Sequence, residues 1–211
     1  MTTFSKALRW IELIALFIGG PLIFYFNILR IPKFIPLLLV FVVSIVYLLL
    51  SKSFNRKAFG INGFNDWKVF GFRVVITLLV ITFLSLTLLP KEHLFELPLN
   101  HIWIWVMIMI FYPLWSAFTQ EVIYRGFYFH RYSSLFKSEK IAILVNAFLF
   151  GFLHIIFRNW VAVAATIVIG LVWAYTYTKH GSLLIVSAEH AIVGNYIFTI
   201  GLGYFFYLPD F

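Results

Sequence analysis

The stretch Phe34–Ser51, FIPLLLVFVVSIVYLLLS, decides the class of this protein. It holds eighteen residues without one Asp, Glu, Lys or Arg, and a helix that crosses a bilayer needs about 17–25 mostly apolar residues. Seven such runs occur along the 211-residue chain, the last interrupted only by Glu189. They are Leu13–Leu29, Phe34–Ser51, Val74–Pro90, Leu97–Gln120, Ile141–Phe157, Asn159–Thr178 and Gly181–Leu208. The sequence therefore predicts an all-α, polytopic membrane helix bundle of about seven transmembrane helices, in a single domain over residues 1–211.

The composition excludes a soluble globular enzyme. Hydrophobic residues make up 63% of the chain and charged residues 11%, with a mean hydropathy of +0.97, whereas soluble domains carry about 25% charged residues. The chain has no Cys, so disulfides, thiolate nucleophiles and Cys-ligated metal centres are excluded as well. The lipid bilayer is the predicted surrounding of the protein.

The net charge of +8 is explained by membrane topology, and we expect no nucleic-acid partner. If the N-terminus lies inside, twelve of the sixteen Lys and Arg residues fall on the inner side. The outer side holds Arg30, Lys33, Lys91 and Arg158. Because basic residues collect in cytoplasmic loops, this split predicts an N-in, C-out orientation. Residues 1–95 form the first three helices, and residues 97–208 form the part that carries the motifs described below.

Five charged or titratable residues lie inside or at the ends of the predicted spans, where such groups are costly and are functional candidates. They are Glu121, Arg125, His154, Glu189 and His190. At about 1.5 Å of helix per residue, Glu121 lies about 15 Å, His190 about 13 Å and His154 about 21 Å from the inner side. We therefore expect these three to face one polar cavity. Glu121 and Arg125 are four residues apart on one helix face, which predicts an ion pair.

Three short motifs resemble those of the CPBP intramembrane proteases, which include the CAAX prenyl endopeptidases and the Abi bacteriocin-immunity proteins. Gln120–Arg125 resembles the motif E-E-x-x-x-R, and Phe150–His154 resembles F-x-x-x-H. Gly181–Leu183, followed by His190 and Ala191, is similar to the third block, whose pattern is H-x-x-x-N. The resemblance covers about Pro113–Asn195 and implies an intramembrane endopeptidase.

The resemblance also implies roles for single residues, and the chain departs from the pattern at two of them. Gln120 stands where the family has its water-activating Glu, and Gly194 stands where the third block has Asn, with Asn195 one residue later. Glu189, directly before His190, is an additional acid that could replace the missing base. The predicted catalytic residues are Gln120, Glu121, His154, Glu189 and His190. The predicted supporting residues are Arg125, Phe150 and Asn195.

Peptide hydrolysis by these residues needs an activated water and a stabilised oxyanion. A carboxylate held away from water can act as the base, and a neutral His can share the water or donate to the oxyanion. We favour this mechanism, which requires no cofactor. The alternative is a zinc ion held by Glu121, His154 and His190, since two His and one Glu suit that metal.

Three functions remain open from the sequence. The first is an endopeptidase of a cell membrane, specifically a bacterial cytoplasmic membrane, that cleaves a peptide or membrane protein of CAAX type or related to bacteriocins. The second is a catalytically inactive relative that acts as an adaptor or immunity protein, which Gln120 favours. The third is a small transporter, because Glu and His in mid-membrane also suit proton relays.

The charge split leads to a direct test of orientation. A reporter fused after Asn55 should report the cytoplasmic side, and one fused after Phe95 should report the opposite side. The measurement is the activity of a side-specific reporter enzyme in intact cells. The same side for both fusions would contradict the N-in assignment.

Overall fold

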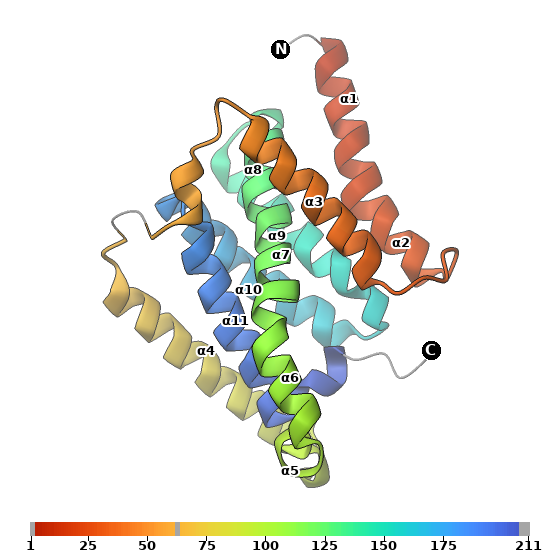
Figure 1. Cartoon of the computed structure of the whole chain (residues 1–211), viewed down its shortest axis with the longest axis vertical. Helices are drawn as coiled ribbons and strands as arrows, with labels where there is room; N and C mark the ends of the chain where they lie inside the picture. Colours follow the sequence, from red (N-terminus) through yellow and green to blue (C-terminus); the bar gives the residue numbers. More distant parts are fainter. Residues whose placement is uncertain (1–2, 62–63, 207–211) are drawn as a thin grey trace. The chain divides into compact units, whose positions relative to one another are not determined.

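The computed structural model describes residues 3–61 and 64–206, and the described part of the chain contains helices and connecting turns but no strand. The all-α expectation is confirmed. The elements are α1 (Thr3–Ile14), η1 (Ala15–Gly19), α2 (Gly20–Tyr25), α3 (Phe34–Leu50), η2 (Arg56–Phe59), α4 (Trp67–Leu88), η3 (Lys91–His93), α5 (Glu96–Asn100), α6 (Ile102–Tyr112), η4 (Pro113–Phe118), α7 (Thr119–Glu121), η5 (Val122–Phe127), α8 (Tyr128–Tyr132), η6 (Ser133–Leu135), α9 (Glu139–Leu153), η7 (His154–Phe157), α10 (Trp160–His180), α11 (Leu183–Ile200) and η8 (Leu202–Phe206). Figure 1 labels the α-helices.

Six helical stretches of the described chain are long and apolar enough to cross a membrane. They are Phe4–Tyr25, Trp67–Leu88, Ile102–Leu135, Glu139–Phe157, Trp160–His180 and Leu183–Ile200. The helix Phe34–Leu50 is apolar but shorter, with 17 residues. Together these seven helices correspond one to one to the seven predicted runs, and the chain is a multi-pass membrane protein.

The ends of several helices differ from the predicted ends, because a charge does not stop a helix. The first helix begins at Thr3 instead of Leu13, and the third begins at Trp67 instead of Val74. The fourth was expected to end at Gln120, yet the helical stretch continues to Leu135. A helix continues through a charged residue wherever the long side chain reaches a partner or the interface. The last helix ends at Ile200, and residues 207 and 208 of the seventh predicted run lie outside the described residues.

Short polar residues and glycines set the boundaries of the helices in the C-terminal half. The side chains of Ser138, Asn159 and Ser182 accept hydrogen bonds from the first turns of α9, α10 and α11, which is the usual N-cap arrangement. Gly181 ends α10 with φ of +64° and Gly201 ends α11 with φ of +111°. Glycine adopts such left-handed conformations without a steric penalty.

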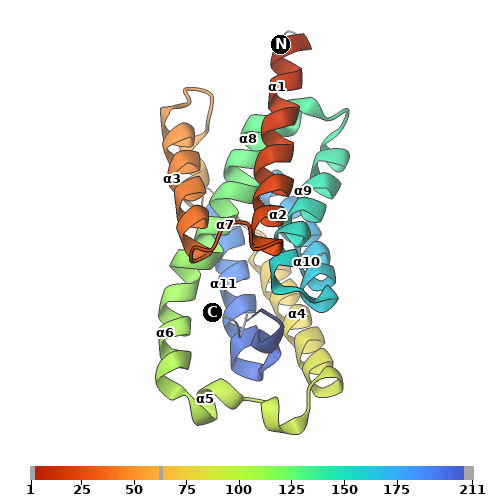
Figure 2. The ribbon, with the colours of Figure 1, turned by 90° about the vertical axis from the view of Figure 1, so that its right-hand side faces the viewer.

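The chain divides into two compact units, each made from two separate stretches. The first comprises the described residues of Met1–Arg56 and Val122–Gly181, and the second those of Lys57–Glu121 and Ser182–Phe211. The first unit contains the antiparallel hairpin of α9 and α10 (Figures 1 and 2). A Cβ atom at Gly151 would overlap Ile167, and one at Gly170 would press against Phe150. Both glycines therefore permit close helix packing.

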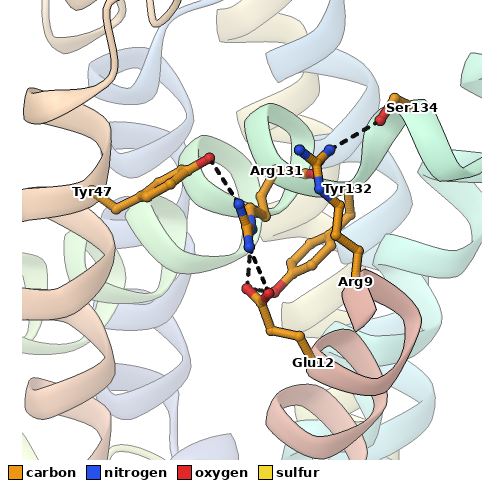
Figure 3. Close-up of polar contacts among 6 residues, drawn as sticks. All are labelled: Arg9, Glu12, Tyr47, Arg131, Tyr132 and Ser134. Carbon is orange, nitrogen blue, oxygen red and sulfur yellow. Dashed lines mark hydrogen bonds and ion pairs between the residues drawn. The ribbon is translucent and has the colours of Figure 1, made fainter. Parts of the chain in front are cut away.

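A polar cluster joins α1, α3 and α8 in the first unit (Figure 3). Arg131 binds both carboxylate oxygens of Glu12, with Nη2 at 2.7 Å from Oε2 and Nε at 3.1 Å from Oε1. The Tyr132 hydroxyl donates to Oε1 of Glu12 at 2.7 Å, and Arg131 also donates to the Tyr47 hydroxyl at 3.4 Å. Arg9 donates to the Arg131 carbonyl and to Ser134. Glu12, the ninth residue of the chain's first membrane helix (Phe4–Tyr25), thus accepts three hydrogen bonds.

The second unit is built around α11. This helix packs against α4, α6 and η4, and it lies between α4 and α6 in both views (Figures 1 and 2). The segment η4 is π-helical, a wider turn that occurs mostly at functional sites. The side chains that α11 presents to these neighbours form the candidate site.

The Glu12 cluster generates a prediction about stability. Glu12→Gln removes the charge that receives Arg131 and Tyr132, and it should lower Tm by about 2–4 °C, the effect of about 1 kcal/mol in a protein of this size. Thermal unfolding of the purified protein in detergent measures the change. Glu92→Gln, at an exposed position, is the control, and an equal Tm for the two variants would show that the cluster adds nothing to stability.

Candidate functional site

Helix α11 carries two adjacent titratable residues into the interior of the second unit. Glu189 is fully buried and His190 is 4% exposed. Both face neighbours of α11 instead of the lipid side, because α4, α6 and η4 surround the helix. A buried titratable group needs hydrogen-bond partners, and each of the two residues has its own.

His190 is hydrogen bonded through both ring nitrogens. Its Nδ1 lies 2.8 Å from Oε1 of Glu121, and its Nε2 lies 3.1 Å from the hydroxyl of Tyr112. A neutral imidazole has one donor and one acceptor nitrogen. With Glu121 as a carboxylate, which only accepts, the ring proton lies on Nδ1, and Nε2 accepts from the Tyr112 hydroxyl. The three side chains form a continuous chain of carboxylate, imidazole and phenol.

The position of Tyr112 explains one departure from the family motif. A Cβ atom built at Gly194 would overlap the ring and hydroxyl of Tyr112. Gly194 is the position four residues after His190, where the resembled pattern has Asn. Glycine at 194 therefore makes room for the aromatic ring, whose hydroxyl binds His190. The polar group beside His190 comes from α6 instead of from α11 itself.

Glu189 forms an ion pair with Arg73 of α4. Nη2 of Arg73 lies 2.6 Å from Oε2, and Nε lies 3.2 Å from Oε1, so both carboxylate oxygens are engaged. The sequence placed Arg73 before its membrane span, and this was wrong because α4 already begins at Trp67. Glu189 thus has a bidentate ion-pair partner on a neighbouring helix. Arginine commonly binds carboxylates in this way, and such a pair has a structural role.

Gln120 and Asn195 bond locally. Gln120 is 8% exposed, and its Nε2 donates to Oγ of Ser116 at 2.8 Å. Its Oε1 is buried without a hydrogen-bond partner among the described residues. Asn195 donates from Nδ2 to the carbonyl of Met109 at 3.2 Å, which ties α11 to α6.

The remaining motif residues lie in the first unit. Arg125 is fully buried, donates to the Gly170 carbonyl at 3.3 Å and places its guanidinium 4.5 Å from the centre of the Phe150 ring. His154, the first residue of η7, is 7% exposed, and its Nδ1 lies 2.8 Å from the Phe150 carbonyl oxygen. Phe150 therefore contacts residues of the first two motifs, and this contact stabilises their local arrangement.

The structure brings together some of the predicted site residues. Glu121 and His190 are hydrogen bonded within the second unit, and Arg125, Phe150 and His154 lie together in the first. The convergence of His154 with Glu121 and His190, and the ion pair of Glu121 with Arg125, stay predictions. In the described part of the chain, no group of three or more His, Asp or Glu side chains could hold a metal ion. The zinc alternative stays a prediction.

Sequence reasoning missed Tyr112 and Arg73, the two partners that α4 and α6 contribute. Arg73 carried a usable signal, since it lies close to the start of a predicted span and its charge needs a partner if the helix begins earlier. Tyr112 is one of 11 tyrosines in the chain, and only the contact of its ring with Gly194 distinguishes it.

The ion pair of Arg73 and Glu189 generates a prediction about stability. Arg73→Met leaves a buried carboxylate without its partner and should cost about 3–5 kcal/mol. The double variant Arg73→Met, Glu189→Leu removes both charges and should recover most of that loss. Thermal unfolding in detergent measures both effects. The control is Lys68→Met, an exposed position on the same helix; a double variant no more stable than Arg73→Met would contradict a simple ion pair.

The comparisons with known proteins agree with the motifs. A family model described as Type II CAAX prenyl endopeptidase Rce1-like matches residues 98–196. This segment includes α6, the three motifs and Asn195, and it extends the resemblance of Pro113–Asn195 towards the N-terminus. No curated protein and no solved structure matches the chain. Residues 98–196 of this chain are therefore similar to the Rce1-like type II CAAX prenyl endopeptidase family.

Proposed function

We propose that this protein is an intramembrane endopeptidase in which Glu121, His190 and Tyr112 activate water against a peptide bond. The observation that carries the proposal is the hydrogen-bonded chain of these three side chains on membrane helices within the matched family segment, with Glu121 and His190 buried. A carboxylate that orients a histidine through Nδ1 is a recurring arrangement in hydrolases, because it leaves Nε2 free to exchange protons.

In the proposed reaction, His190 is the general base. Its Nε2 takes a proton from water while the water oxygen forms a bond to the scissile carbonyl carbon. The same proton then passes to the leaving amine as the carbon–nitrogen bond breaks. Glu121 stabilises the positive charge that the ring carries between these two transfers.

Tyr112 is the proposed donor to the carbonyl oxygen. Its hydroxyl lies beside Nε2 of His190, and when the substrate displaces it from the ring, its O–H can turn to the oxygen on which negative charge develops. A preorganised donor at that point stabilises the transition state, and loss of one such donor costs about 10²–10³-fold in kcat. Glu189 is not assigned as the base, because Arg73 engages both of its oxygens.

The family description supplies the proposed substrate class. By analogy with CAAX prenyl endopeptidases, the substrate is a prenylated C-terminal peptide or a membrane protein, and a bacteriocin-related peptide is the alternative. By the same analogy His154 has a role in catalysis, since it occupies the histidine of the F-x-x-x-H motif. The proposed location is the bacterial cytoplasmic membrane.

A specific observation favours a second candidate function, that of a catalytically inactive relative. Gln120 stands at the position of the resembled water-activating Glu, and its amide nitrogen donates to Ser116. An amide does not accept a proton as a base. In such a relative, the chain of Glu121, His190 and Tyr112 would serve to hold α6 and α11 together.

The test compares protein termini in membranes of cells that make the wild-type protein or single variants. Peptides with new termini should appear with the wild type and disappear with His190→Ala, Glu121→Gln and His154→Ala. Tyr112→Phe should reduce their rate of formation by about 10²-fold or more. His101→Ala, an exposed histidine of the same unit, is the control and should keep full activity.

Two other results would contradict the proposal in different ways. Identical termini in cells with the wild type and with His190→Ala would mean that the site does not cleave peptides. Termini that appear only with Gln120→Glu would identify the natural protein as the inactive relative.

A further inference from the structure

An apolar pocket lies within the first unit, away from the residues assigned to hydrolysis. Segments η1, α2, α3, η5 and the end of α9 with η7 form its walls, with Phe17, Gly20, Leu37, Tyr124 and Leu153 among the lining side chains. The pocket has a volume of about 120 Å³ and is open to its surroundings, which is enough for a segment of a hydrocarbon chain. A pocket of this character between membrane helices accepts a hydrocarbon chain in preference to water.

Two cations lie at this pocket, one in its lining and one next to the segments that form it. Lys33 belongs to its lining and directly precedes α3. Arg158 follows η7 and is placed by contacts with Tyr25, donating to its carbonyl at 3.0 Å and lying 5.7 Å from its ring centre. Burial and the nearby Arg158 charge together lower the pKa of Lys33 below its usual range. Two cations that repel each other favour an anion between them.

Lys33 and Arg158 both lie outside the membrane-crossing stretches, next to the ends of helices whose apolar sides line the pocket. This arrangement matches a phospholipid, whose charged phosphate stays at the interface while its chain enters the hydrocarbon region. We propose that the pocket is a binding site for an anionic glycerophospholipid, with one acyl chain between α2 and α3 and the phosphate held by Lys33 and Arg158. This site is independent of the proposed peptidase activity.

Gly20 offers a way to close the pocket without disturbing the helix. It lines the pocket, its backbone is α-helical, and a Cβ atom built there meets nothing within 4 Å. A leucine at this position would therefore extend into the empty space instead of into a packed neighbour. Gly20→Leu is expected to fold and to compete with a bound acyl chain.

The experiment measures lipid-dependent stabilisation of the full-length protein in a neutral detergent. Phosphatidylglycerol and phosphatidylcholine with the same acyl chains are titrated separately, and Tm is recorded at each concentration. Phosphatidylglycerol at ten times its Kd should raise Tm by about 3–6 °C, and phosphatidylcholine should raise it by less than half as much. Native mass spectrometry should show one retained phosphatidylglycerol.

Variants assign the effect to the pocket. Lys33→Gln and Arg158→Gln should each reduce the phosphatidylglycerol shift to that of phosphatidylcholine, and Gly20→Leu should abolish both shifts. Lys91→Gln, an exposed cation on the same predicted side of the membrane, should keep the full shift. Equal shifts for the two lipids, or a full shift in Lys33→Gln, would overturn the proposal. The two charge variants decide the question even if Gly20→Leu does not fold.

Discussion

The contact of His190 with Glu121 and Tyr112 is the interaction on which the second unit depends. Membrane helices offer a buried imidazole no water, so both ring nitrogens must find partners in the protein. Glu121 supplies one and Tyr112 the other, and α11 is thereby fixed to the stretch that runs from α6 through η4 and α7. The neighbouring carboxylate of Glu189 needs its own partner, which is Arg73. This ion pair connects α4 to α11.

The same hydrogen bonds give the unit its chemistry. A histidine between a carboxylate and a phenol is held in one tautomer and one orientation before any substrate arrives. In the proposed mechanism, the structural requirement and the catalytic one therefore coincide at the same three side chains. Glu189 lies one residue away and is also buried, but it pairs with Arg73 and is not part of this group.

Much of the fold could be predicted from the sequence because a membrane restricts what can span it. Seven apolar runs, six of them free of charged residues, indicated seven helices, and the caps at Asn159 and Ser182 mark two of their starts. The prediction failed at helix ends with charged residues, as at Glu12 and Arg73. A charge-free run ends at the first charge by definition, whereas a helix ends where its backbone loses hydrogen-bond partners.

The candidate site was predictable only in part. Glu121 and His190 could be named because titratable residues in a membrane span are rare, and they prove to be hydrogen-bond partners. Tyr112 could not be named, since its role depends on the distance between α6 and α11. Such a distance is a property of tertiary packing and leaves no periodic trace in the sequence. Arg73 was missed for a related reason, because its partner is 116 residues away along the chain.

The overlap between Tyr112 and any side chain at position 194 has a consequence for His190. The two positions are coupled, because any side chain at 194 requires the Tyr112 ring to move or to be replaced by a smaller residue. Replacing Gly194 alone would therefore displace the hydroxyl that binds His190, and the effect would reach the histidine without any change in its own position.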